Sequence, residues 1–322
     1  MGSNRRDRRN SNRYVAHITN RTVCGFPFLR CPFFNLLIWS ALAHAQQFTY
    51  SRVAAVQFMG NHFHLILFSR GKKISRFMNI FQGELAKYVR RCYGDVYLGK
   101  VWQSRFKEQH LATARDVLNK MIYMYLNPAR ANLVDSIDQW EGVSSWNMMN
   151  SGSRVRSCRW VPPRVVGPIH RKPGVKEYGE LLADAAEETS FTVDHFGWLK
   201  CFPEIQQDPH WTPEKVRAEL RHAVYKEEKM LRHYRMVQQR SVKTAAHEHW
   251  ISPEYKPEKR GRTPFIICHD RKLRSELIRS YRDFCAEVRA AYERIKGGEH
   301  PTKVHYPPGA FHPCGVIYDL VP

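Results

Sequence analysis

One long apolar stretch, YSRVAAVQFMGNHFHLILFS at residues 50–69, limits the folds open to this chain more than any other feature. It is too long for one straight strand and Gly60 interrupts it, so it predicts two strands, or one strand with a sharp bend at Met59–Asn61. Residues two apart in a strand share a face, so His62 and His64 should lie side by side while Phe63 points into a core. Two neutral imidazoles on one face can bind a metal ion. The alternative is that the two histidines lie on a partly solvent-exposed strand and bind no ligand.

The apolar spacing around this stretch predicts the order β-α-β-β-α-β-α. The expected elements are a strand at 14–23, a helix at 33–47, the two strands of 50–69, a helix at 73–94, a strand at 99–111 and a helix at 113–134 that begins at Thr113 and ends near Asn127–Pro128. Helices that alternate with short strands favour an α+β fold, here a ferredoxin-like antiparallel sheet with helices on one face.

Beyond residue 149 the composition changes. We expect a flexible basic arm at 1–13, a folded domain at 14–149, a linker rich in Ser, Gly, Pro and Arg at 150–168, and a basic, mainly helical C-terminal region at 169–322. Two long charged helices are predicted in that last region, at 212–240 after the N-cap Thr212 and at 270–296 before two glycines.

The net charge is +21, from 51 Lys and Arg against 30 Asp and Glu. Such an excess indicates a polyanionic partner, because cationic side chains neutralise phosphates and release counterions. Charge alone does not separate DNA, RNA and an acidic membrane. The apolar run at 33–45 is too short to span a bilayer, so no membrane segment is expected. Eight scattered cysteines without a C-x-x-C pair argue against a zinc ribbon or a disulfide framework and favour a reducing compartment such as the cytoplasm.

The segment MIYMYLNPAR, residues 121–130, supplies a second set of polar groups. Tyr123 and Asn127 are four residues apart and so lie on one helix face, whereas Tyr125 is rotated about 200° away. Beside the histidine face, Asn127 could complete a metal site through its carbonyl oxygen and Tyr123 could act as a nucleophile. The alternative is an ordinary helix tyrosine with a buried ring and a hydrogen-bonded hydroxyl.

Five blocks in this order, GNHFHLIL, ISRFMNIFQGELAKYVRR, VWQSRFK, YMYLNPARANLV and SSW, resemble the HUH single-tyrosine transposases of the insertion-sequence type. Within that group the chain looks most like the REP-associated tyrosine transposases, and the resemblance covers about residues 14–146. Gly60 stands where the family usually has proline, and Tyr125 where a histidine often precedes LNP. Asn132 replaces a glycine, but asparagine tolerates the left-handed conformation that ends a helix. None of these departures removes a catalytic atom.

The resemblance implies a ferredoxin-like HUH transposase domain at 14–149 that cleaves and rejoins single-stranded DNA at palindromic hairpins. His62, His64 and Asn127 would hold Mg²⁺ or Mn²⁺, and Tyr123 would attack the phosphodiester to leave a 5′-phosphotyrosine link and a free 3′-OH. The C-terminal region would add DNA contacts. The chain would act in the bacterial cytoplasm at the nucleoid, as a monomer or as a homodimer.

Seven basic residues are candidates for DNA contact in this reading: Arg21, Lys72, Lys73, Arg76, Arg105, Lys107 and Arg130. Two other functions stay open from sequence. One is a catalytically silent, host-retained regulator that binds hairpin DNA. The other is a metal-dependent hydrolase that releases a free 5′-phosphate without a covalent adduct.

Overall fold

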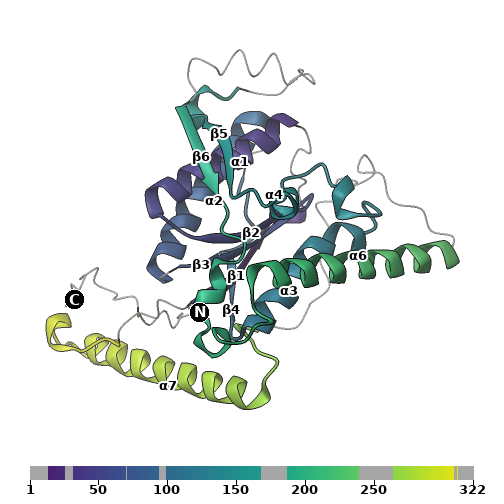
Figure 1. The fold of residues 1–322 in the computed structure, drawn as a ribbon. Coiled ribbons are helices and arrows are strands. Elements are labelled where there is room, and N and C mark those ends of the chain that lie inside the picture. The colour runs from purple at the N-terminus through teal and green to yellow at the C-terminus, as the bar shows by residue number, and fades with distance from the viewer. Residues whose placement is uncertain are drawn as a thin grey trace.

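The computed structural model describes residues 14–25, 32–69, 71–93, 99–167, 187–238, 264–307 and 310. It is an α+β structure in which a mixed five-stranded sheet is enclosed by helices (Figure 1). The basic arm predicted at 1–13 lies outside the described residues.

The sheet has the strand order β2-β3-β1-β4-β7. Its strands are β1 (Val15–Arg21), β2 (Val53–Phe58), β3 (His62–Phe68), β4 (Lys107–Leu111) and β7 (Ile266–Ile267). The first four pair antiparallel, as expected, but β7 pairs parallel with β4. The expectation of a purely antiparallel sheet is therefore wrong at this edge, because a short segment from much later in the chain covers β4, which would otherwise present unpaired backbone groups.

The bend around Gly60 is confirmed. β2 ends at Phe58 and β3 begins at His62. Within β3, Phe63 is fully buried on one face of the sheet, and His62 and His64 alternate with it. The register pairs His62 with Arg21 and His64 with Thr19, so both histidines lie toward the C-terminal end of β1.

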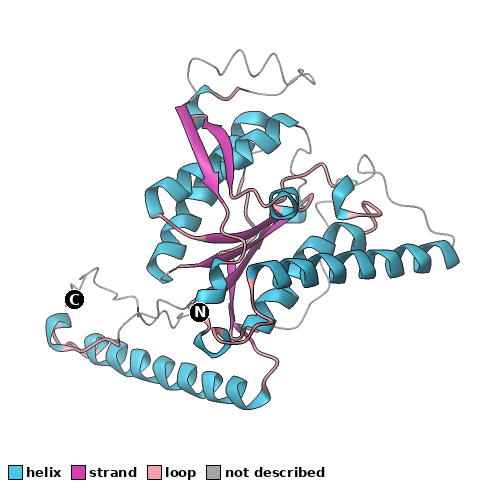
Figure 2. Ribbon diagram, in the orientation of Figure 1, coloured by secondary structure: helices cyan, strands magenta, loops and turns pink. Residues whose placement is uncertain are grey.

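Helices cover both faces of the sheet rather than the one that was expected (Figure 2). The longer helices are α1 (Pro32–Thr49), α2 (Gly71–Tyr93), α3 (Ala114–Arg130), α4 (Trp146–Ser151), α6 (Pro213–Val237) and α7 (Arg271–Lys296). One core lies between α1, α2 and side chains such as Ile18 and Phe63. A second core places α3 and α6 against Val15, Ile66 and Phe68. Both faces of the sheet must be covered because β1 and β3 carry apolar residues on both of their sides.

Local sequence signals define α3. Thr113 caps its first turn in a capping box with Asp116. The helix continues to Arg130, two residues past the expected stop, because the missing N–H of Pro128 removes only one backbone bond within the last turn. Asn132 then takes the left-handed conformation that was expected of it, with φ of 56°.

The strand predicted over 99–111 is shorter, since β4 contains only its last five residues. The carbonyl of Val101 accepts from the backbone N–H of Val23, just past the end of β1, and the N–H of Gln103 donates to the carbonyl of Arg21 at that end. Trp102 forms an isolated bridge with Thr22 between them. This part follows β1 irregularly instead of joining β4, so Gln103 and Arg105 are exposed while Val101 is buried.

The predicted linker at 150–168 contains β5 (Val155–Trp160), which pairs with β6 (Glu187–Thr192) in a two-stranded sheet against α1. Val161 and Val166 join the core under α1, so these residues do not behave as a spacer. The Ser, Gly, Pro and Arg composition of this segment reflects the exposed outer face of this two-stranded sheet.

The C-terminal helices form where the sequence placed them, capped by Thr212 and Asp270. However, α6 packs directly on α3, whereas α7 lies apart from the other helices and packs Phe284 and Val288 against Val304 (Figure 1). No helix in the described part of the chain is long and apolar enough to cross a membrane.

The described short 3₁₀ helices connect these elements: η1 (Val23–Gly25), η3 (Ile137–Gln139), η4 (Pro163–Val165), η5 (Gly197–Cys201), η6 (Pro203–Ile205) and η8 (Pro301–Lys303).

Candidate active site

The sheet and α3 bring the predicted site residues together. Asn127 on α3 lies with its side-chain nitrogen 2.8 Å from Nε2 of His64 on β3. The Tyr123 ring stands nearly perpendicular to the His64 ring, with 5.8 Å between the centroids. His62 and His64 are neighbours as well, at 5.1 Å between ring centroids. Four residues chosen from two segments of sequence therefore meet at one place on the α3 side of the sheet.

Tyr123 is accessible and surrounded by positive charge. Its side chain is 38% exposed. The Lys120 amine lies 4.8 Å from the centre of its ring, and the Arg130 guanidinium lies 5.7 Å from it. Lys120 makes no ion pair with any residue that the structure describes, whereas Arg130 pairs with Glu227 at 2.9 Å. An exposed phenol beside a cation without a carboxylate partner can receive a phosphate group.

Tyr125 has the opposite surroundings. It is fully buried, and its hydroxyl hydrogen-bonds to the hydroxyl of Ser145 at 2.9 Å. Burial raises its pKa above the ordinary value of tyrosine. Ser145 also accepts a hydrogen bond from the backbone N–H of Val56 on β2, so Tyr125 belongs to the packing between α3 and the sheet. Of the two tyrosines in this turn of sequence, only Tyr123 can reach a substrate.

His64 rests on a second histidine that sequence reasoning did not select. His17 on β1 is buried, and its Nε2 lies 2.9 Å from Nδ1 of His64. Its Nδ1 lies 3.0 Å from the side-chain oxygen of Gln109 on β4. The available signal was a polar residue at a buried position of the apolar strand VAHITN, which needs a partner inside the protein.

Burial keeps these two rings neutral. It lowers the pKa of His17 to about 3, with a further lowering by the charge of Lys120 and an opposing contribution from the Gln109 hydrogen bond. The pKa of His64 is also held well below its usual value, first by burial and then by His17, His62 and Lys120. A neutral imidazole carries one ring-nitrogen lone pair, which is the form that binds metals.

The donors present fit a divalent cation. Among the described residues, no cluster of three or more His, Cys, Asp or Glu side chains is placed to hold a metal, so the candidate set is smaller: two imidazoles and one amide. The Nδ1 of His62 contacts the side-chain oxygen of Asn61 at 2.8 Å, and it must donate to that oxygen, which places the lone pair of the neutral ring on Nε2. Imidazole nitrogens with an amide oxygen suit Mn²⁺, and Mg²⁺ with more retained water.

The basic residues chosen as DNA contacts are only partly gathered at the site. Arg21 pairs with His62 in the register of β1 and β3, and Arg130 lies by Tyr123. Lys107 begins β4 opposite Thr19, and Arg105 precedes it, both exposed. Lys73 and Arg76 are exposed on the first turns of α2, which follows the far end of β3, about 20 Å of strand away from His62. The side chain of Lys72 lies outside the described residues.

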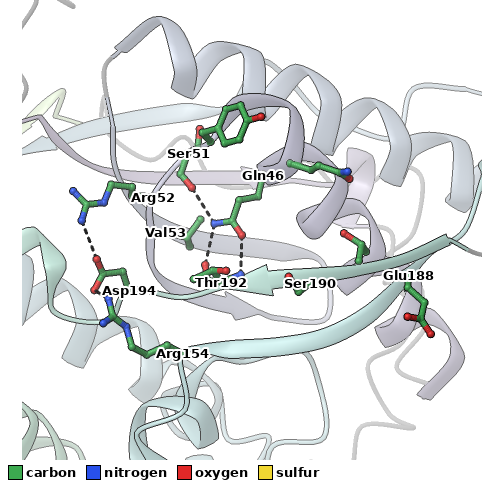
Figure 3. Close-up of a pocket in the computed structure, with 12 residues that line it drawn as sticks. Gln46, Ser51, Arg52, Val53, Arg154, Glu188, Ser190, Thr192 and Asp194 are labelled. Carbon is green, nitrogen blue, oxygen red and sulfur yellow. Dashed lines mark hydrogen bonds and ion pairs between the residues drawn. The ribbon is translucent and has the colours of Figure 1, made fainter.

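A separate hollow of about 740 Å³ lies between the end of α1, the start of β2 and β6 (Figure 3). Its polar groups are engaged with one another. Gln46 bonds to the backbone of Ser51 and Thr192, and Asp194 pairs with Arg52 and Arg154. These contacts fasten the two-stranded β5–β6 sheet to the main sheet, and none of the predicted site residues lines the hollow.

Comparisons with known proteins give one distant likeness. No family model matches the chain, and no curated protein matches it significantly. A solved structure of a REP-associated tyrosine transposase bound to a REP hairpin is similar to it with a TM-score of 0.38 and 16% sequence identity. The match covers 54% of this chain and 93% of that chain. At this distance the likeness carries no functional argument, so function must be argued from the site.

Proposed function

We propose that this protein is a metal-dependent transposase that cleaves and rejoins single-stranded DNA at hairpin sites through a 5′-phosphotyrosine intermediate. The observation that supports this most is that α3 and β3 bring Tyr123, Asn127 and His64 together. The phenol of Tyr123 is exposed and lies next to the buried imidazole of His64. Structural tyrosines are usually buried through the ring and paired through the hydroxyl, as Tyr125 is here.

The order of the first four strands supports an HUH-type ferredoxin-like domain. β1, α1, β2, β3, α2 and β4 follow in a β-α-β-β-α-β sequence, and the strands stand in the spatial order β2-β3-β1-β4. In this arrangement β3 is interior, so a histidine pair on it is held rigidly and faces the helix that follows β4.

In the proposed reaction Tyr123 Oη attacks phosphorus, the phenol gives up its proton, and the P–O3′ bond breaks as the departing 3′ oxygen gains a proton. A Mg²⁺ or Mn²⁺ ion held by His62, His64 and Asn127 would polarise the non-bridging phosphate oxygens when bound. Lys120 and Arg130 would stabilise charge on the same phosphate. A 3′-OH can later attack the phosphotyrosine, which restores the diester and the phenol without an external energy source.

The basic C-terminal region would extend the DNA-binding surface. α6 packs against α3, and it carries cationic side chains such as Arg221, Lys226 and Arg232, while α7 is mostly exposed and rich in arginine. Backbone contacts of this kind add affinity and salt dependence more than sequence selectivity.

The test is a denaturing gel of the full chain with labelled single-stranded hairpins, including palindromic repeats adjacent to its own coding sequence, in Mg²⁺, Mn²⁺ or EDTA. We expect a metal-dependent protein–DNA adduct that Tyr123→Phe abolishes. Tyr125→Phe and Tyr50→Phe, a buried and an exposed tyrosine, serve as matched controls and should retain it.

Two outcomes would contradict the proposal. Hairpin binding without any adduct, unaffected by EDTA, would identify a silent DNA-binding regulator. Cleavage that leaves a free 5′-phosphate and persists in Tyr123→Phe would identify a hydrolase.

A further inference from the structure

A continuous chain of hydrogen bonds runs beneath the site, from the C-terminal segment to α3. It crosses β4, β1 and β3, and every interior member is buried. Its successive contacts are Pro264 O to Gln109 Nε2 at 2.9 Å, Gln109 Oε1 to His17 Nδ1 at 3.0 Å, His17 Nε2 to His64 Nδ1 at 2.9 Å, and His64 Nε2 to Asn127 Nδ2 at 2.8 Å. We refer to these residues as the histidine relay.

The direction of the relay is set at its C-terminal end. A backbone carbonyl only accepts, so Gln109 must turn its NH₂ toward Pro264 and its oxygen toward His17. That oxygen also only accepts, so His17 donates through Nδ1–H. The neutral ring then has its lone pair on Nε2, where it accepts the Nδ1–H of His64. By the same rule, the lone pair of His64 is on Nε2, facing Asn127.

Reversing this order would be costly. The opposite tautomers would leave a lone pair on His17 Nδ1, so the Gln109 amide would have to turn over to donate to it, and this would set the Gln109 oxygen against the carbonyl oxygen of Pro264. Gln109 and His64 are each 6% exposed and His17 only 2%, so water cannot replace a lost partner. A buried donor or acceptor without a partner destabilises the fold.

From this geometry we propose that His17 and Gln109 are positioning residues that hold His64 as its Nδ1–H tautomer and so keep its Nε2 lone pair available to the divalent cation. That lone pair accepts from Asn127 Nδ2 in this structure, so the Asn127 amide must turn its oxygen toward the ion when the ion binds. The metal part rests on the proposed function, whereas the tautomer does not. A ligand histidine held through its other nitrogen is commonly bound more firmly to its metal. The orientation begins at Pro264, so the segment that adds β7 to the sheet also sets the protonation pattern of the site.

The first measurement is the tautomer itself. Full-length protein with ¹⁵N-labelled histidine, kept in EDTA near neutral pH, is studied by long-range ¹H–¹⁵N correlation, with His64→Gln for assignment. We expect His64 to be protonated on Nδ1 and bare on Nε2. In Gln109→Met the fixed state should be lost, with the Nε2–H form appearing. A wild-type His64 protonated on Nε2 would overturn the proposal whatever the protein does with DNA.

The second measurement is Mn²⁺ affinity, followed by the EPR signal of the free ion. His17→Leu should weaken binding by about 10–100-fold. His17→Gln should stay near wild type, because its amide can still accept from His64 and donate to Gln109. His195→Leu is the matched control: it removes another buried histidine, which bonds to the Ser153 backbone, and should leave Mn²⁺ affinity unchanged.

Circular dichroism establishes that each variant is folded. Equal Mn²⁺ affinity for wild type and folded His17→Leu would contradict the proposal, as would an equal loss in His195→Leu. If wild type binds no Mn²⁺, the proposed metal-dependent function fails, and the tautomer measurement still decides the relay. If His17→Leu does not fold, His17→Gln and Gln109→Met carry the comparison.

Discussion

The two faces of the sheet bury polar groups in opposite ways. On the α3 side, the histidine relay is open-ended: it begins at a backbone carbonyl and finishes at Asn127 and His64, beside the exposed Tyr123. On the α1 and α2 side, a second group, which we call the core cluster, is closed. It consists of His44, Glu84 and Trp160.

The members of the core cluster contact one another. The Glu84 carboxylate contacts Nδ1 of His44 and accepts a hydrogen bond from the Trp160 indole at 3.3 Å. The His44 ring stacks on the Trp160 ring, with 4.2 Å between the ring centroids. Burial raises the pKa of Glu84 to about 7, against the opposing effects of Trp160 and Lys87, and burial lowers the pKa of His44. Both directions favour a neutral pair. A closed polar group stabilises the packing, while an open one presents a reactive atom, so their variants should separate by readout.

The largest effect is expected at the open end. Lys120→Met should slow formation of the protein–DNA adduct by roughly 10²-fold, because it removes a cation that would stabilise charge on the attacked phosphate. The rate is measured from the time course of the adduct band at saturating hairpin. Lys120→Arg should retain most of the rate, and Lys215→Met, on the first turn of α6, is the exposed control. A wild-type rate in Lys120→Met would place this amine outside the chemistry.

A smaller and purely structural effect is expected in the core cluster. With a pKa near 7 folded and 4.5 unfolded, Glu84 binds its proton more tightly in the folded protein. Its contribution to the free energy of unfolding is therefore full below about pH 4.5 and decreases as the pH rises through 7, by up to about 3 kcal/mol. Glu84→Gln should flatten that dependence in urea unfolding between pH 4.5 and 8.

Glu204→Gln changes an exposed carboxylate and should leave the pH dependence of the free energy of unfolding unchanged. Glu84→Gln should still form the adduct normally at pH 7. If Glu84→Gln no longer forms the adduct although its free energy of unfolding is unchanged, the two faces of the sheet are coupled and the contrast between them is wrong.

The smallest effect concerns the rim of the site. Glu227→Gln removes the partner of Arg130, an exposed ion pair that contributes no more than about 1 kcal/mol to stability. We expect hairpin affinity at low salt to rise about two- to threefold, because Arg130 becomes available to a phosphate. Fluorescence anisotropy against salt concentration measures this. Unchanged affinity at all salt concentrations would show that Arg130 does not face the DNA.

Features with a local cause could be predicted from sequence. Gly60 divides β2 from β3, Thr113 opens α3, and Asn132 takes the left-handed conformation after it. The i, i+4 spacing of Tyr123 and Asn127 was sufficient to place both on one face of α3. Each of these depends on residues a few positions apart.

Features with a distant cause could not be predicted. The two residues of β7 are a strand only because β4 has an open edge, and Ser- and Arg-rich residues become β5 because α1 offers an apolar surface. His17 and Gln109 meet only through the register of β1 with β4, and Gln109 is oriented by a carbonyl from the C-terminal segment. The pattern of a strand fixes which of its residues share a face, but not which residue of a strand distant in the sequence lies opposite each of them.

The position of β7 in the chain has a consequence for synthesis. β4 ends at residue 111, but its parallel neighbour is translated only after residue 265. Until then a nascent chain can pair β1 to β4 while the outer backbone of β4 stays open, which is the kind of edge through which chains associate wrongly. Long-range pairing of this sort also slows folding. A premature stop between these positions would release a polypeptide whose β4 edge is unpaired, so we expect loss of the last third of the gene to yield an aggregating product rather than a smaller folded protein.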